Sequence, residues 1–281
     1  VYKRQILFCS VGPNPGHLLS EIISFSEFYN TINEPHRVAI PIALYRAVPF
    51  IFQVLKELCP GINLVMLDDK VIYRFRVLIT RRNRWFNFIR HWEAIPFEQI
   101  HSKLIFEDLQ SIGNDFIDDI RAVCNFSRRT YENSRHRIQS NNKYIMVKTV
   151  AADSLLTPQR ALHITKEARD IALSQGYQFL SITDFEDLNE YVATLYSAKS
   201  IVLSYGAITC ANRFFLSPDA SVLLIANMAY KEEYEAGNNF WHIRHSHLCP
   251  VKRQHVLLDF PNRIDVEQML DLLSNASHLD E

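Results

Sequence analysis

Short unbroken apolar runs alternate with amphipathic stretches along most of this chain. The clearest runs lie at residues 4–9, 36–41, 62–67, 143–148, 177–182, 200–203 and 221–226. Apolar runs of this length, rich in β-branched residues, predict buried strands, and stretches with apolar residues every three or four positions predict helices. A further strand is predicted within 71–80, and 255–259 is predicted as an edge strand. Strands and helices in alternation are typical of an α/β fold with parallel sheets.

The helix with the strongest boundary signals is predicted over residues 159–174. Thr157 suits the N-cap, Pro158 suits the first helical position, and Gly176 stands just past the end. A helix over 185–197 is predicted to begin at a cap supplied by Thr183 or Asp184. Other helices are predicted over residues 45–58, 104–126, 131–138 and 266–273.

The most polar stretch of the chain separates two halves of similar size. This stretch is residues 128–142, RRTYENSRHRIQSNN. A chain of 281 residues with 48% apolar content is long enough to bury the cores of two ordinary domains. We therefore predict one domain over residues 1–140 and a second over 141–281.

Charge and cysteine content narrow the possible functions. The net charge of -1 provides no global field to recruit nucleic acid or an acidic membrane surface. No apolar run approaches the roughly 20 residues of a membrane-spanning helix. The five cysteines are scattered without a C-x-x-C pair, and three (Cys9, Cys124 and Cys210) are expected to be reduced core residues. This favours a cytoplasmic protein, although the start at Val1 leaves open a removed leader or anchor and a lumenal placement.

The stretch from Tyr196 to Ala226 predicts a strand–turn–helix–strand unit. A strand over 200–203 is followed by the turn Ser204-Tyr205-Gly206-Ala207, a helical pattern that ends at Ser217-Pro218, and a second strand over 221–226. A right-handed crossover makes such strands parallel, and ligands bind beyond their carboxyl ends. Gly206 lets backbone approach a ligand, and the first N–H groups of the next helix attract an anion. The turn is thus predicted to seat a pyrophosphate; the alternative is an ordinary connection whose glycine only relieves strain.

Two positions in the N-terminal half also suggest ligand chemistry. His17 opens an apolar helix after a strand and a loop rich in proline and glycine, so it is a candidate general base, or else a surface histidine. Arg82 and Trp85 belong to a basic, aromatic-rich patch over 81–92. Such a patch lines a sugar-chain groove, binds single-stranded nucleic acid, or packs on the domain edge, and the near-zero net charge favours one of the two uses without nucleic acid.

No metal site is predicted. Asp68-Asp69 is expected to be a turn between strands. The spacing of His242, His245 and His247 does not place three ligands on one helix face. Asn212, unfavourable in mid-helix, indicates either a local bond that shapes the Gly206 turn or a ligand contact.

The unit around Gly206 resembles the C-terminal signature of glycosyltransferase family 61, which includes plant β-1,2-xylosyltransferases and protein O-GlcNAc transferases. Five residues stand in the family's order: Gly206, Ala207, Asn212, Phe215 and Pro218. Tyr205 replaces the signature's histidine, and one extra residue separates Ala207 from Asn212. The resemblance covers residues 144–224 and, in the N-terminal half, only the segment GHLLSEII around His17, which is similar to a family pattern of histidine before an apolar helix.

The resemblance implies a GT-B fold, in which two Rossmann-like domains face each other across a cleft. The first domain would bind the acceptor through residues such as Arg82 and Trp85, the second would bind a nucleotide sugar, and the last helix would cross back to the first domain. Lys148 stands where the family has an arginine and would neutralise a diphosphate as a cation, or else it is a solvated strand end. Glu190 lies on the helix before the signature and would accept hydrogen bonds from ribose hydroxyls, or else it belongs to a solvated helix face.

The implied reaction is an inverting transfer from a UDP-sugar, UDP-xylose or UDP-N-acetylglucosamine first, to a hydroxyl of a glycan or glycoprotein. His17 would act as the base, and no divalent ion or cofactor beyond the donor substrate is expected. Three alternatives stay open: a sugar-binding module without catalysis, another nucleotide-sugar enzyme such as an epimerase, and a nucleic-acid binder.

Overall fold

The computed structural model forms two compact units, Val1–Phe126 and Ser127–Glu281. It describes residues 5–7, 22, 25–26, 29–30, 32, 37–47, 49–68, 70–71, 78–79, 114–134, 142–147, 162–181, 184–185, 187–205, 212–227, 251 and 253–279. The division between the units lies inside helix α6 (Asn114–Ser134), whereas the polar stretch of the sequence placed a boundary at residue 140.

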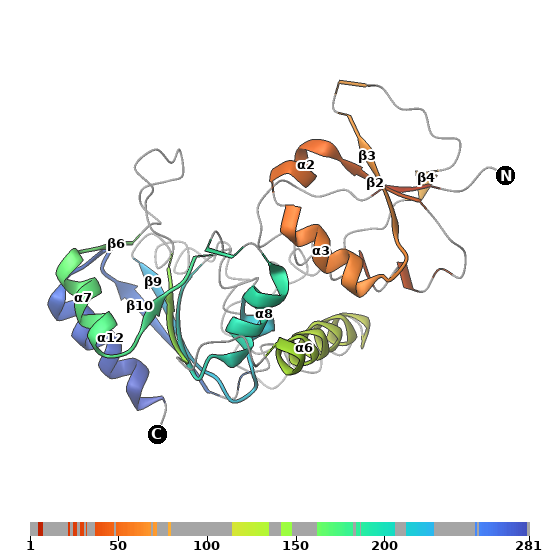
Figure 1. The fold of residues 1–281 in the computed structure, drawn as a ribbon. Coiled ribbons are helices and arrows are strands. Elements are labelled where there is room, and N and C mark those ends of the chain that lie inside the picture. The colour runs from red at the N-terminus through yellow and green to blue at the C-terminus, as the bar shows by residue number, and fades with distance from the viewer. Residues whose placement is uncertain are drawn as a thin grey trace, which may run out of the picture. The chain divides into compact units, whose positions relative to one another are not determined.

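The first unit contains a four-stranded parallel sheet in the order β3-β2-β1-β4 (Figure 1). Its strands are β1 (Gln5–Leu7), β2 (Arg37–Pro41), β3 (Asn63–Leu67) and β4 (Leu78–Ile79). Each lies within a run that the sequence predicted as a strand. The chain adds β2 and β3 on one side of β1 and then places β4 on the other side.

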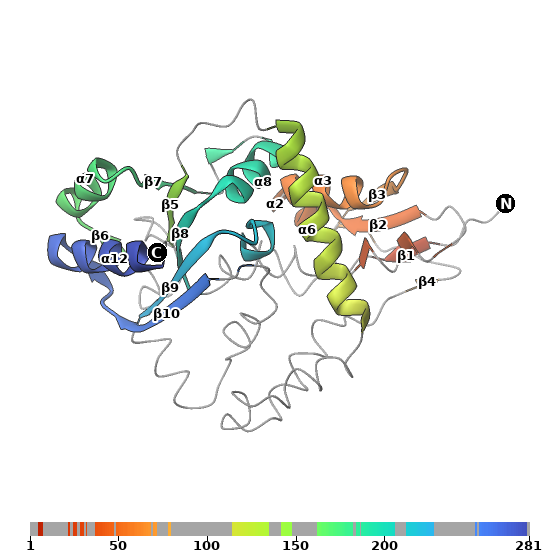
Figure 2. The same ribbon diagram turned by 90° about the horizontal axis from the view of Figure 1, so that it is seen from below.

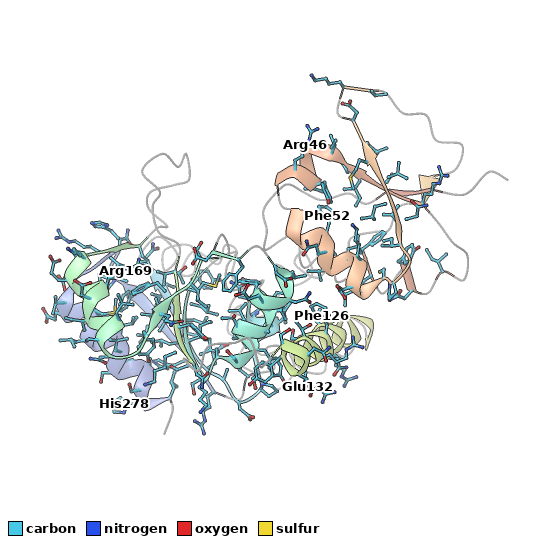
Figure 3. All side chains as sticks on the ribbon, viewed as in Figure 1. Arg46, Phe52, Phe126, Glu132, Arg169 and His278 are labelled. Atoms are coloured by element: carbon cyan, nitrogen blue, oxygen red, sulfur yellow. The ribbon has the colours of Figure 1, made fainter. Side chains whose placement is uncertain are left out.

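Two helices follow β2, where the sequence predicted one. These are α2 (Ile42–Ala47) and α3 (Pro49–Leu58), and the single helix predicted over 45–58 is therefore wrong. Pro49 explains the difference, because proline lacks an N–H group and suits the first position of a new helix. Phe52 of α3, labelled in Figure 3, is fully buried. Its ring lies 5.4 Å from that of Tyr45.

The second unit is built on a five-stranded parallel sheet in the order β10-β9-β8-β5-β7. Its strands are β5 (Lys143–Met146), β7 (Gln178–Phe179), β8 (Ser200–Ser204), β9 (Ser221–Asn227) and β10 (Arg253–Phe260). β10 is an edge strand, as predicted. A separate two-stranded parallel sheet pairs β6 (His163–Ile164) with β11 (Arg263–Ile264).

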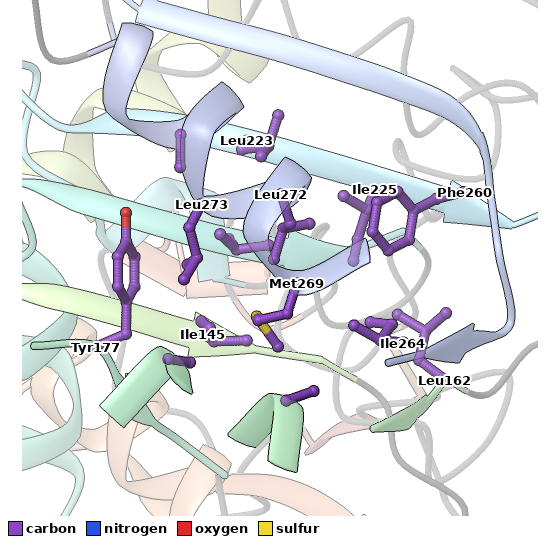
Figure 4. Close-up of a cluster of buried hydrophobic side chains, with 14 residues drawn as sticks. Ile145, Leu162, Tyr177, Leu223, Ile225, Phe260, Ile264, Met269, Leu272 and Leu273 are labelled. Atoms are coloured by element: carbon purple, nitrogen blue, oxygen red, sulfur yellow. The ribbon is translucent and has the colours of Figure 1, made fainter. Parts of the chain in front are cut away.

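Helices cover both faces of the five-stranded sheet (Figure 2). On one face, α7 (Lys166–Ser174) and α12 (Val266–His278) pack over the strands. Figure 4 shows their shared core, in which Met269, Leu272 and Leu273 of α12 meet Ile145, Leu223 and Ile225 of the sheet. The other face carries α8 (Leu188–Ser197) and the short 3-10 helix η5 (Arg213–Phe215). Burial on both faces explains why every residue of β8 and β9 is buried.

Three helix predictions in the second unit are wrong in part. α7 begins at Lys166 rather than at residue 159, because residues 163–164 pair with β11 and Thr165 supplies the N-cap. α8 begins at Leu188 after an Asp187 cap, not after Thr183 or Asp184. α12 continues to His278, past the predicted end at Leu273. It packs on the sheet of the second unit, and its crossing to the first domain stays a prediction.

α6 is one helix where the sequence predicted two. Ser127 and Thr130 are buried and continue the helix face of Val123 and Phe126, at a spacing of three and four residues. Because these two small residues are polar, the apolar spacing is interrupted between residues 126 and 131, and the sequence predicted two helices.

The predicted α/β fold with two Rossmann-like parallel sheets is confirmed. The placement of the two units across a cleft stays a prediction.

Candidate functional site

The order of strands reverses between β5 and β8. From β5 the chain moves to β7 on one side and then returns to place β8, β9 and β10 on the other. At such a reversal the neighbouring crossovers leave the sheet in opposite directions, which opens a crevice beyond the carboxyl ends of the two strands. β5 and β8 are paired in register, Met146 with Leu203, so their carboxyl ends are neighbours. The candidate site is therefore the edge where these two strands end.

The turn that the sequence singled out begins at this edge. Ser204 is the last residue of β8 and is buried. The N–H of Tyr205 donates to the carbonyl of Ile225 in β9 at 2.8 Å, and the buried Tyr205 side chain packs against Ala226. Tyr205 thus extends the sheet, and its ring forms part of the packed edge. Gly206 and Ala207 lie outside the described residues, as does Lys148, which follows Met146 by two positions.

Asn212, where the described chain resumes, makes two side-chain bonds inside the unit. Its Oδ1 accepts from the hydroxyl of Tyr191 in α8, and its Nδ2 donates to Sδ of Met146 at 3.0 Å. The side chain is 2% exposed. The sequence offered a local bond or a ligand contact as reasons for this asparagine. The described bonds instead reach residues distant in the chain, in α8 and β5, and a ligand contact stays a prediction.

Tyr191 is a central residue of this region that the sequence analysis did not single out. It is buried, and its ring contacts Phe185 at 5.2 Å and Phe215 at 6.3 Å, both edge-on. Burial raises the pKa of its hydroxyl, which therefore stays protonated and able to donate. The available signal was the helical spacing of Leu188, Tyr191, Val192 and Leu195, which marks the buried face of α8.

Glu190 lies in the first turn of α8 and is exposed. Because α8 connects the carboxyl end of β7 to the start of β8, its first turn lies at the same edge of the sheet as the ends of β5 and β8. Glu190 is thus on the correct edge for a ligand bound there.

The helix predicted after the Gly206 turn is described only in part. Its described portion is the helical Asn212 and η5, so the predicted anion seat of helix N–H groups stays a prediction. Arg213, in η5, is a fully buried cation that the sequence analysis also missed, and its guanidinium lies 5.1 Å from the ring centroid of Phe214.

The candidate residues of the first unit lie outside the described residues. His17 follows β1 in the chain, and Arg82 and Trp85 follow β4. β1 and β4 are the pair at which the strand order of the first sheet reverses. Of the helix predicted after His17, the described Ile22, Phe25 and Ser26 are helical and buried.

Other candidates from the sequence are described only in part. Asp68 forms a turn, with its carboxylate accepting from the N–H of Lys70 at 2.9 Å. Within the described ranges no three His, Cys, Asp or Glu side chains gather to hold a metal ion; His242, His245 and His247 lie outside those ranges. None of the helices in the described part of the chain is long and apolar enough to cross a membrane. Cys59 is in no disulfide bond.

Comparison with known proteins finds similarity among solved structures only. No family model and no curated protein matches the sequence. Among solved structures, the glycosyl transferase family 9 protein from Veillonella parvula DSM 2008 is similar over 98% of this chain and 89% of that one, with 10% sequence identity and a TM-score of 0.37. A likeness this distant does not assign a function, and the resemblance to family 61 stays a prediction.

Proposed function

We propose that this protein is a glycosyltransferase whose second unit binds a UDP-sugar beyond the carboxyl ends of β5 and β8. One observation carries the proposal: the reversal of strand order falls between the two strands that lead into Lys148 and into the Ser204–Ala207 turn. The sequence predicts diphosphate binding at the turn, and the resemblance to family 61 implies it at Lys148. Reversal points are where open parallel sheets bind nucleotides.

Each residue has a distinct role in the proposed complex. Lys148 supplies a cation to the diphosphate, and the N–H groups of the Gly206 turn donate to its oxygens. The exposed carboxylate of Glu190 accepts hydrogen bonds from the ribose hydroxyls. In the first unit, His17 is the general base, and Arg82 and Trp85 contact the acceptor.

The reaction is an inverting displacement at the anomeric carbon of xylose or N-acetylglucosamine. His17 takes the proton of an acceptor hydroxyl on a glycan or glycoprotein, and the oxygen forms a bond to the anomeric carbon. The bond from that carbon to the diphosphate breaks, and UDP leaves from the opposite face. Lys148 and the turn stabilise the charge that builds on the leaving diphosphate. These groups are all supplied by the chain, so the proposal requires no divalent ion.

The first test is calorimetric titration with UDP, UMP and free sugars. UDP is expected to bind more tightly than UMP because the second phosphate reaches Lys148. Lys148→Ala should weaken UDP binding about tenfold or more, the scale of one charge-assisted interaction. The matched control is Lys199→Ala, an exposed lysine just before β8 at the opposite edge of the same sheet, which should bind UDP like wild type. Binding of free sugars without UDP would favour the sugar-binding module instead.

The second test measures UDP release from UDP-xylose and UDP-N-acetylglucosamine, with and without glycan acceptors. A transferase releases UDP faster when acceptor is present, and His17→Ala should remove most of that increase while leaving UDP affinity unchanged. Consumption of donor without any acceptor dependence would favour an epimerase or related enzyme. Unimpaired turnover by His17→Ala would rule out this histidine as the base.

A further inference from the structure

The bonds of Asn212 join three elements that meet at the proposed donor site. Asn212 stands between the Gly206 turn and η5, Tyr191 is in the first half of α8, and Met146 is the last residue of β5. One amide side chain therefore ties the chain that follows β8 to both the neighbouring strand and the covering helix. The two partners, Tyr191 and Met146, are buried as completely as Asn212, at 2% exposure each.

The geometry gives this tie a defined direction. Tyr191 donates to the amide oxygen of Asn212, and the amide nitrogen donates to the sulfur of Met146 at 3.0 Å. Because both ends of the amide are engaged, its orientation is fixed. Edge-on contacts with Phe185 and Phe215 hold the Tyr191 ring, so the hydroxyl has little freedom to follow a shifted partner.

We infer that Tyr191 is a positioning residue for the donor site, acting through Asn212. This inference rests on the proposed function. The Tyr191–Asn212 pair fixes Asn212 beside Met146, the last residue of β5. Because only four residues separate the turn at 204–207 from Asn212, fixing Asn212 restricts the conformations open to the turn. Asn212 then contributes by placing backbone rather than by contacting the sugar nucleotide itself. Loss of the tyrosine hydroxyl should weaken diphosphate binding although Tyr191 is buried among protein groups.

The chain contains a matched control for a merely structural effect. Tyr177 is a second buried tyrosine of the same unit, and its hydroxyl lies 3.4 Å from that of Ser200. Ser200 is the first residue of β8, at the opposite edge of the sheet. Tyr191→Phe and Tyr177→Phe therefore each remove one buried hydroxyl and keep the ring, but only the first acts at the proposed site.

The experiment compares the two variants with wild type in the full-length chain. Hydrogen exchange without ligand is followed in the peptide covering residues 205–216, and UDP affinity is measured by calorimetry. Tyr191→Phe should speed exchange in that peptide and weaken UDP binding about fivefold, as expected for one lost hydrogen bond. Tyr177→Phe should leave both the exchange rate and the UDP affinity within twofold of wild type, even if it lowers the melting temperature as much as Tyr191→Phe does.

A second variant, Asn212→Ala, tests whether the two residues act as a pair. If they do, Tyr191→Phe should add little to the loss of UDP affinity that Asn212→Ala already causes. Additive losses would overturn the pairing. If Tyr191→Phe does not fold, the exchange rate and UDP affinity of Asn212→Ala test the inference in its place.

The remaining outcomes separate this inference from the proposed function. If Tyr191→Phe does not change hydrogen exchange in the 205–216 peptide, the positioning role is overturned whether or not UDP binds. Faster exchange with unchanged UDP affinity overturns it as well. Equal losses of affinity in both tyrosine variants would show a general stability effect, which also contradicts it. If wild type binds no uridine nucleotide, the proposed function and the donor-site role both fail, while the exchange rates still decide whether the pair holds the segment.

Discussion

The backbone N–H of Thr165 donates to the carbonyl of Ile264 at 3.0 Å. Thr165 is the N-cap of α7, and Ile264 immediately precedes Asp265, the N-cap of α12. The small β6–β11 sheet thus places the first residues of α7 and α12 side by side, although most of the second unit lies between these two helices in the chain. These two helices form the layer that buries one face of the five-stranded sheet, so their starting points position much of its core.

Asp265→Ala should destabilise the second unit through the start of α12. The Asp265 carboxylate accepts from the N–H groups of Glu267 and Gln268 at 3.0 and 3.3 Å. The N–H of Asp265 in turn donates to Oε1 of Gln268 at 3.2 Å. Losing such a capping box costs about 1 kcal/mol. Urea unfolding should show that loss in the free energy of unfolding. The control is Asp170→Ala, which changes an exposed aspartate inside α7 and should stay within about 0.5 kcal/mol of wild type. Equal effects would contradict the capping role.

The starts of these helices show what the sequence predicts well and what it does not. α12 begins at Val266, as its apolar spacing predicted. The start of α7 was misplaced because Thr157-Pro158 is a strong local start signal and Thr165 a weaker one. The first residue of α7 is determined by the pairing of residues 163–164 with residues 263–264. These partners lie far apart in the chain, so no local pattern predicts the pairing.

Leu272→Ala should destabilise the protein strongly, and Leu270→Ala should not. Leu272 is fully buried in the core between α12 and the sheet, whereas Leu270 is 46% exposed on the same helix. The substitutions are chemically identical, so burial alone separates them. We expect losses of about 2–5 kcal/mol for Leu272→Ala and under about 0.5 kcal/mol for Leu270→Ala, measured by urea unfolding. A small loss for Leu272→Ala would argue against the packing of α12 on this sheet.

The candidate site was predictable only in outline. The run of strands and the position of the Gly206 turn follow from local pattern, and Asn212 was recognisable because it is unfavourable in a helix. Tyr191 was not recognisable, because its spacing fits an ordinary core position of α8. Its bond to Asn212 depends on how the chain after β8 folds against a helix formed earlier in the sequence.

Gly176→Ala should cost stability purely through the backbone. Gly176 follows α7 with φ of +83°, and an added Cβ would meet no atom within 4 Å. The cost is thus that of a left-handed conformation for an L-residue, about 1–2 kcal/mol. Gly176→Asn should cost less, because asparagine adopts this conformation more readily. Thermal unfolding of the two variants checks the order, and an alanine variant as stable as the asparagine variant would contradict it.

Cys59 provides a prediction for alkaline pH. Its side chain is 1% exposed, and its thiol lies 3.6 Å from the carbonyl of Ser26. Burial raises the pKa of the thiol from its ordinary value of 9.0 to about 12. Between these values the unfolded chain releases the thiol proton and the folded chain keeps it. The stabilisation is complete below pH 9 and is lost as pH rises toward 12.

Cys59→Ala should therefore flatten the alkaline part of the stability profile. Above pH 9, wild type should lose free energy of unfolding faster than the variant, with the difference in slope approaching about 1.4 kcal/mol per pH unit. Burial also raises the pKa of Tyr144 and Tyr191, and these groups titrate in both proteins and cancel in the comparison. The pKa of Tyr29 is raised by burial and by the charge of Cys59, so Cys59→Ala also removes part of the Tyr29 contribution to the alkaline slope. Urea unfolding at pH 8, 9.5 and 10.5 gives the slopes. The variant is expected to be less stable at pH 8, because its substitution leaves a cavity, so the slope is the quantity that decides. Parallel profiles would show that the Cys59 thiol is open to ionisation in the folded protein.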